Sequence, residues 1–238
     1  TVLLPTFSAN TAEKKYDEML GTIHQSLRML LFVMTPAAMG LILFAHPVIE
    51  IIYQWKAFDQ RSTQLASLAL QCYAPGLLVF SLAKIFTPAF YALKDTTTPF
   101  KAGLFCLALN VVLNITFIWL LPPYKEHAGI ALGTVASESV YAVILAVCLH
   151  RKLGSPHWIQ IGRAFIRHLF AALVMGVIAI VLFHALMNTI PMSWMIYAKL
   201  KQIILLLISI TIGGVFYVAC TLLLRCSEVT ELIKIVRK

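Results

Sequence analysis

The strongest constraint on this 238-residue chain is a succession of six long apolar runs. The hydrocarbon core of a bilayer is about 30 Å thick, so a spanning helix needs roughly 20 apolar residues. The runs are Met29–Ile49, Ser62–Ala83, Ala102–Tyr124, Ala128–His150, Leu169–Met187 and Gln202–Leu224. Only the fourth contains a charged residue, Glu138. Six such runs, separated by short polar connections, predict an all-α integral membrane protein.

The composition agrees with this fold class. Apolar residues make up 60% of the chain and charged residues 12%, against about half and a quarter in soluble domains. The net charge of +9 does not indicate a nucleic-acid partner, because nucleic-acid binders gather their basic residues on one folded face. Here the basic residues lie between the apolar runs, as membrane topology requires.

The distribution of basic residues predicts the orientation. We expect spans near residues 27–45, 64–92, 101–121, 128–149, 168–187 and 202–224, with residues 1–8 closing a seventh. Alternate connections then carry thirteen basic residues on one side and five on the other, with Lys84 inside a span. Because cytoplasmic loops are rich in Lys and Arg, both ends of the chain are expected in the cytoplasm of a bacterial inner-membrane protein.

The same boundaries predict three regions. Residues 1–26 form the end of a membrane helix and a cytoplasmic linker. Residues 27–150 form four spans, and residues 151–238 form the third region. This last region holds a cytoplasmic amphipathic segment, the final two spans and a cytoplasmic tail. Since the chain opens without Met and without a signal-peptide pattern, we expect it to be truncated upstream.

Several connections show their own patterns. Residues Ser8–Ser26 are polar and mixed in charge, which favours a linker with a surface helix. Pro47–Gln60 keeps apolar residues at helical spacing, so a short interfacial helix is predicted there. Thr98 and Pro99 fit the N-cap and first position of the third span. The basic segment Gly162–His168 is expected to lie on the inner leaflet.

Lys84 is the first candidate functional residue. It lies ten residues before Lys94, about 15 Å along a helix, so its charge is near the middle of the membrane. Such a lysine is costly unless it faces water, a counter-ion or a polar substrate. The alternative is a lysine that reaches the headgroups with its long stem.

Three polar residues in the third and fourth spans are further candidates. Glu138, with Ser137 and Ser139 beside it, is either a cavity acid, as a counter-ion to Lys84 or part of an ion-coupling site, or a hydrogen-bonded group between helices. Asn110 and Asn114 are four residues apart on one helix face. They fit hydrogen bonding between helices or the lining of a cavity.

Catalytic and metal motifs are missing from the sequence. Five cysteines and seven histidines show no metal-ligand spacing, and His168 and His184 are interpreted as interfacial residues without a third ligand. We expect no enzyme activity, no catalytic residue, no metal and no cofactor. A coupling ion or use of the membrane potential is left open.

Several stretches resemble one known family. The opening Thr-Val-Leu-Leu-Pro-Thr-Phe-Ser is similar to the end of the eighth helix in MurJ (MviN) lipid II flippases. The run from Ala83 to Pro99, with Phe-Tyr-Ala and Asp-Thr-Thr-Thr-Pro, resembles that family's tenth helix and the loop after it. His127-Ala128-Gly129 matches the start of the twelfth.

The resemblance implies the C-terminal part of a fourteen-helix, two-lobe transporter of the MOP exporter superfamily, from the end of helix eight to helix fourteen. It implies a flippase that moves lipid II to the periplasmic leaflet by alternating access and so supports peptidoglycan synthesis and cell shape. The headgroup would lie in a cationic cavity and the polyprenyl tail in a groove beside the last two helices. The expected partners are lipid II, membrane lipids and the N-terminal lobe of the same protein.

The family's cavity arginines lie upstream of residue 1, so only the tenth-helix lysine carries over, onto Lys84. The family pattern gives Glu138 no role. Two alternatives stay open: another MOP-type carrier, such as a polysaccharide-lipid flippase or a cation-coupled drug exporter, and a non-transporting scaffold of cell-wall assembly.

Overall fold

The computed structural model describes residues 3–54, 58–122, 124–189, 198–224, 226 and 228–229. Its helices are α1 (Leu3–Ala12), α2 (Tyr16–Tyr53), α3 (Gln60–Tyr73), α4 (Gly76–Ala92), α5 (Thr97–Leu120), α6 (Glu126–Leu153), α7 (Trp158–Thr189) and α8 (Ala198–Leu223). By length and composition, six helical segments could cross a membrane, with α3 and α4 together forming one of them. The predicted six spans are therefore confirmed.

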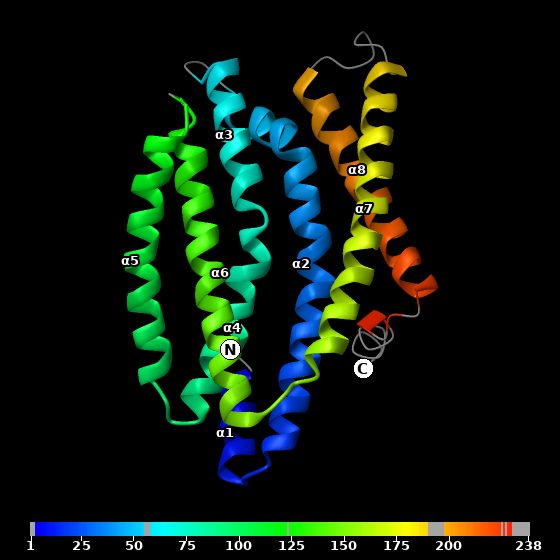
Figure 1. The fold of residues 1–238 in the computed structure, drawn as a ribbon. Coiled ribbons are helices and arrows are strands. Elements are labelled where there is room, and N and C mark those ends of the chain that lie inside the picture. The colour runs from blue at the N-terminus through cyan, green and yellow to red at the C-terminus, as the bar shows by residue number, and fades with distance from the viewer. Residues whose placement is uncertain are drawn as a thin grey trace.

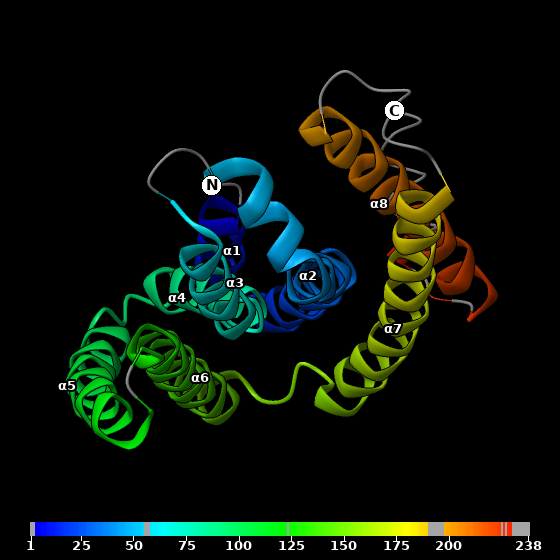
Figure 2. The same cartoon turned by 90° about the horizontal axis from the view of Figure 1, so that it is seen from above.

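The helices stand roughly side by side, and their connections alternate between two ends (Figure 1). Seen from above, α5 and α6 form one pair, α2, α3 and α4 lie in the middle, and α7 and α8 form a second pair beside α2 (Figure 2). The contacts agree: α5 packs on α6, α6 on α3 and α4, and both α7 and α8 on α2.

Three clusters of buried side chains hold this arrangement. The first joins α1, α2, α4 and α6, with Phe7, Leu27, Phe90 and Leu145 at its centre. The other two join α2 to the α7–α8 pair, one around Phe32 and one around Phe44 and its neighbours. Lipid already solvates apolar side chains, so close packing is the main force between such helices.

Helix α2 extends further than the predicted first span. Residues 16–26, expected in a linker, are its first turns, and Pro36 and Pro47 lie inside it. The predicted separate interfacial helix at Pro47–Gln60 is therefore wrong for residues 47–53, which form the last turns of α2. Figure 1 shows this end of α2 turned aside, as expected near a proline. Residues 55–57 lie outside the described part.

Helices α3 and α4 replace the single helix predicted for 64–92. Pro75 separates them, because its ring has no N–H to donate and clashes with the carbonyl four residues before it. Pro88, by contrast, lies within α4 without ending it. At the other end of α3, the Asp59 carboxylate caps the helix by accepting a hydrogen bond from the Ser62 N–H at 2.8 Å.

The basic segment Gly162–His168 belongs to the continuous helix α7. One further expectation is corrected. The side chain that caps α5 is Asp95 and not Thr98, since Asp95 Oδ1 accepts hydrogen bonds from the N–H groups of Thr97 (3.1 Å) and Thr98 (3.0 Å).

Candidate functional site

Lys84 lies in the middle of α4 with its side chain exposed. Leu78, Leu82 and Phe86 line an apolar groove on one side of that helix. Lys84 is two residues from both Leu82 and Phe86, and two residues correspond to about 200° around the helix axis. The Lys84 side chain therefore points away from the groove. Within the described residues it makes no ion pair and no hydrogen bond, and it lies about 12 Å along the axis from Ala92.

Glu138 lines a different hollow, of about 410 Å³, between α5 and α6. Its other lining residues are Gly103, Cys106, Leu107, Asn110, Thr134, Ser137 and Tyr141. Glu138 is half-buried, and no ion pair joins it to Lys84 in the described structure. The Lys84–Glu138 counter-ion pair is therefore not present among the described residues.

Asn110 and Asn114 form a polar seam between α5 and α6. Asn110 Nδ2 donates to Ser137 Oγ at 3.1 Å and contacts Thr134 Oγ1 at 3.4 Å. Asn114 Nδ2 donates to Asn110 Oδ1 at 3.1 Å. The predicted hydrogen bonding between helices is thus present, and Asn110 also lines the hollow, whereas Asn114 lies beyond it beside Gly133.

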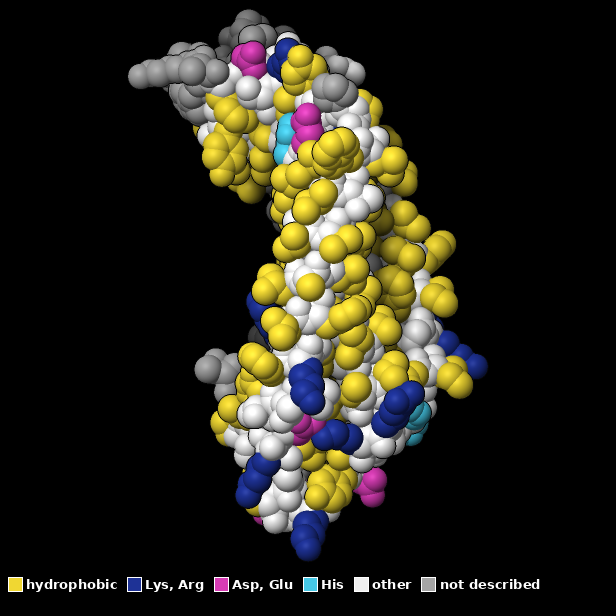
Figure 3. All heavy atoms as spheres, turned by 60° about the vertical axis from the view of Figure 1, so that its left-hand side comes forward, with side chains coloured by type: hydrophobic (Ala, Val, Ile, Leu, Met, Phe, Trp, Pro, Cys, Tyr) yellow, Lys and Arg dark blue, Asp and Glu magenta, His cyan; other side chains and the backbone are white. Residues whose placement is uncertain are grey.

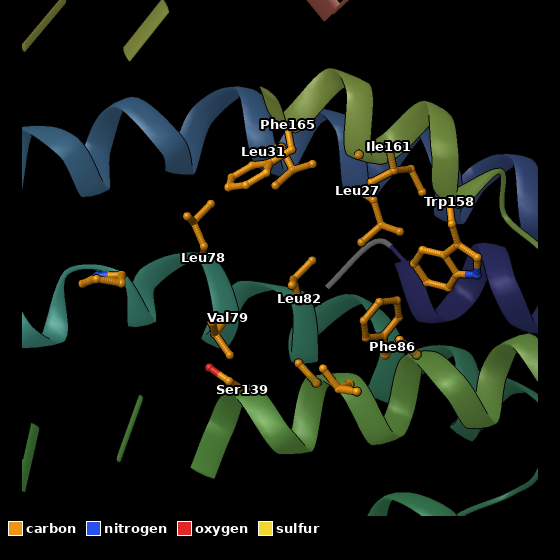
Figure 4. A pocket seen from close by; sticks show the side chains of 15 residues that line it. Leu27, Leu31, Leu78, Val79, Leu82, Phe86, Ser139, Trp158, Ile161 and Phe165 are labelled. Carbon is orange, nitrogen blue, oxygen red and sulfur yellow. The ribbon is translucent and has the colours of Figure 1, made fainter. Parts of the chain in front are cut away.

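The apolar groove has a volume of about 470 Å³ and is enclosed by α2, α4, α6 and the first turns of α7. Figure 4 shows Leu78 and Leu82 of α4 across the groove from Ile161 and Phe165, with Trp158 beside Phe86 at one end. The one hydroxyl in the lining, that of Ser139, already donates to the Val135 carbonyl. Such a lining suits hydrocarbon and offers nothing to a charged group.

The α7–α8 pair presents a continuous apolar surface. Phe170, Leu173, Val177 and Val181 on α7 are exposed at spacings of three and four residues, which places them on one helix face. The exposed residues of α8 include Leu207, Val215 and Leu222. The sequence predicted two uniformly apolar helices here, and the structure leaves their outer faces open to lipid.

A buried polar cluster beside α8 was missed by the sequence interpretation. His168, predicted as interfacial, is fully buried, and its Nε2 lies 3.5 Å from Glu228 Oε1. The same oxygen accepts a hydrogen bond from Arg28 Nε at 2.6 Å. These residues come from α7, from the segment after α8 and from α2, and no sequence spacing relates them. By contrast, His184 is exposed.

A second ion pair missed by the sequence interpretation joins the α4–α5 connection to the end of α6. Asp95, 13% exposed, pairs with Lys152. Hydrogen bonds from Lys152 and then Thr98 hold the pKa of the Asp95 carboxyl well below its usual range.

Comparison with known proteins gives one consistent family. The family model described as "Lipid II flippase MurJ" matches residues 1–200. A "Probable lipid II flippase MurJ" of Vibrio cholerae is 31% identical over 150 residues, 63% of this chain and 28% of that protein. One of Buchnera aphidicola is 31% identical over 221 residues, 91% of this chain and 41% of that protein.

Among solved structures, "Lipid II flippase MurJ, inward closed conformation" matches with a TM-score of 0.67 at 21% identity. The match covers 94% of this chain and 43% of that one, so it shows a shared fold. The chain spans well under half the length of these relatives.

Proposed function

Because the chain belongs to the MurJ family of lipid II flippases, we propose that it is the C-terminal part of a transporter that moves lipid II across the bacterial inner membrane. Movement runs from the cytoplasmic to the periplasmic leaflet by alternating access, and it supplies peptidoglycan synthesis. Flipping breaks and forms no covalent bond, so the protein needs only to bind, enclose and release its substrate.

The observation that carries this proposal is Lys84. Lipid II carries a diphosphate that must cross an apolar barrier of about 30 Å. A fixed cation in a wet cavity lowers the cost of that passage, since it replaces part of the water around the phosphates. Within the described residues Lys84 forms no ion pair, and its side chain lies on the exposed side of α4, opposite the apolar groove. We place the headgroup beside it.

The polyprenyl tail needs only an apolar surface. We place it along α7 and α8, where exposed apolar side chains follow one face of α7. A carrier of cationic drugs is the alternative that Glu138 favours, because an acid in a polar hollow suits a cationic substrate. The positive charge of Lys84 argues against a drug carrier, because it would repel a cationic substrate.

The orientation follows from the charged residues. Figure 3 shows Lys and Arg side chains gathered at the lower end of the molecule, below a broad hydrophobic surface. The α4–α5 and α6–α7 connections lie at that end (Figure 1). By the positive-inside rule we assign this end to the cytoplasm, and with it the C-terminus.

Substitutions of Lys84 test the headgroup contact by complementation of a strain depleted of its own flippase, in the full-length protein. We expect Lys84→Arg to retain part of the activity, because the charge stays at the same depth while the planar guanidinium aims its donors differently. Lys84→Ala and Lys84→Glu are expected to lose transport at normal membrane levels, measured by blot.

The matched control is Lys125→Ala, which removes an exposed lysine at the opposite end of the molecule from the α4–α5 connection. It should grow as the unmodified protein does. Normal growth of the Lys84→Ala strain at normal expression would contradict the headgroup contact and indicate a lysine that only reaches the membrane surface.

A further inference from the structure

His168, Cys226 and Glu228 converge at the inner edge of the α7–α8 pair. One ligand atom from each residue lies within 4.8 Å of the other two. All three are buried, with exposures of 0%, 4% and 2%. A nitrogen, a sulfur and a carboxylate oxygen gathered this closely form a typical ligand set for Zn²⁺.

The hydrogen bonds of Tyr217 determine which nitrogen of His168 is available. The Tyr217 hydroxyl donates its one proton to the Phe32 carbonyl at 2.7 Å. Its contact with His168 Nδ1 at 3.4 Å must therefore be donated by Nδ1–H. In the neutral ring this leaves a lone pair on Nε2, directed toward Glu228.

Two atoms of the cluster are unsatisfied. His168 Nε2 and Glu228 Oε2 are buried without a hydrogen-bond partner in the described structure. Buried polar atoms of this kind cost free energy unless something fills the space between them. A metal ion bound by His168 Nε2 and Glu228 Oε2 would satisfy both atoms.

Arg28 belongs to the outer shell of this cluster. It bonds Glu228 Oε1, which leaves Oε2 for a metal and fixes the plane of the carboxylate. The 2.6 Å contact between Arg28 and Glu228 Oε1 is an ion pair, so Glu228 is present as a carboxylate.

We propose that His168 Nε2, the Cys226 thiolate and the Glu228 carboxylate form a zinc site, with a water as the fourth ligand. The thiolate and the carboxylate are both anionic, and the carboxylate also pairs with Arg28. Zinc replaces the proton of the Cys226 thiol, and one proton passes to solvent for each ion bound.

The zinc site ties the segment after α8 to α7, and through Arg28 to α2, so that the last helix is fixed to the bundle by an ion as well as by packing. This inference does not depend on the substrate of the transporter.

The test uses the full-length protein in detergent, with its affinity tag removed because a histidine tag binds zinc. Zinc per chain is measured by elemental mass spectrometry after dialysis against Zn²⁺. We expect about one ion per chain in the unmodified protein and in Cys148→Ser, a control on α6. Cys226→Ser and His168→Gln should bind none. Cobalt should give thiolate-to-metal charge-transfer absorption that Cys226→Ser lacks.

Tyr217→Phe separates a metal site from a hydrogen-bonded cluster. It removes only the oxygen that orients His168 and should weaken zinc binding about 10- to 100-fold. Zinc should also raise the unfolding temperature of the unmodified protein but not that of Cys226→Ser. The site would be overturned if the unmodified protein bound no zinc, or if Cys226→Ser and His168→Gln bound as much zinc as the unmodified protein.

Discussion

At the scale of single residues, Gly133 allows α5 and α6 to approach closely. A Cβ atom at this position would lie 2.3 Å from Asn114 Oδ1 and 3.3 Å from the Asn114 backbone nitrogen. Small residues allow helix backbones to meet in this way. The hydrogen bonds of Asn110 to α6 depend on the same short distance.

Gly133→Ala should therefore destabilise the protein by about 1–3 kcal/mol through overpacking, despite the better helix propensity of alanine. Asn114 would have to move and lose its bond to Asn110. Thermal unfolding in detergent measures the effect. Gly40→Ala is the control, because nothing lies within 4 Å of a Cβ there, and it should gain up to about 1 kcal/mol. Equal behaviour of the two variants would contradict the close contact.

Asp95 combines a helix cap with an ion pair, so its contribution should depend on pH. Its pKa is lowered in the folded protein, so the stabilisation is complete above the ordinary carboxyl pKa and is lost as the pH falls below it. At pH 7, Asp95→Ala should cost about 0.5–2 kcal/mol. The difference from the unmodified protein should shrink as the pH is lowered below about 4.

Unfolding curves between pH 7 and pH 3 measure this difference. Lys152→Ala is the matched variant, because it removes the ion pair and keeps the cap; it should cost less than about 1 kcal/mol. A gap between Asp95→Ala and the unmodified protein that stays constant over the whole pH range would refute the assignment.

At the scale of helices, α7 and α8 combine two surfaces. Their inner faces pack on α2 through Phe32 and Phe44, and the outer face of α7 is apolar from Phe170 to Val181. A helix pair between lipid on one side and a lipid tail on the other needs no polar stripe.

A photoreactive polyprenyl-tail probe should therefore crosslink to α7 and α8. Mass spectrometry of the labelled peptides locates the crosslinks, and an unrelated fatty-acid probe of similar length is the control for general lipid contact. The apolar groove of Figure 4 shares only the first turns of α7, from Trp158 to Phe165. Crosslinks restricted to α2, α4 and α6 would place the tail in that groove and exclude the outer surface of α7.

At the scale of the whole molecule, the orientation predicts which residues reagents reach from outside the cell. Single cysteines at Lys94 and Arg151, both exposed at the basic end, should be protected from a membrane-impermeant maleimide. A cysteine at Lys125 should react. Trp55, another position expected outside, lies beyond the described residues. Permeabilised cells provide the control, since all three positions should react there. Labelling of position 94 in intact cells would reverse the orientation.

The sequence determined the membrane class, the number of spans and the alternation of their connections. Each depends on local properties: the length of an apolar run against the thickness of the bilayer, and the basic residues beside it. Local composition also identified Lys84, Glu138 and the asparagines as costly polar groups in apolar runs, and the bonds from Asn110 to α6 agree with that interpretation.

Only the tertiary structure decided which of these groups meet. Lys84 and Glu138 looked like partners because both lie near mid-membrane, yet position along a helix says nothing about direction around it, and no ion pair joins them. His168 looked interfacial because it ends a basic segment, but packing of α7 against α2 and α8 buries it. Its contacts with Tyr217 and Glu228 join positions 49 and 60 residues away in the sequence, and such distant pairings follow from how helices pack and not from local pattern.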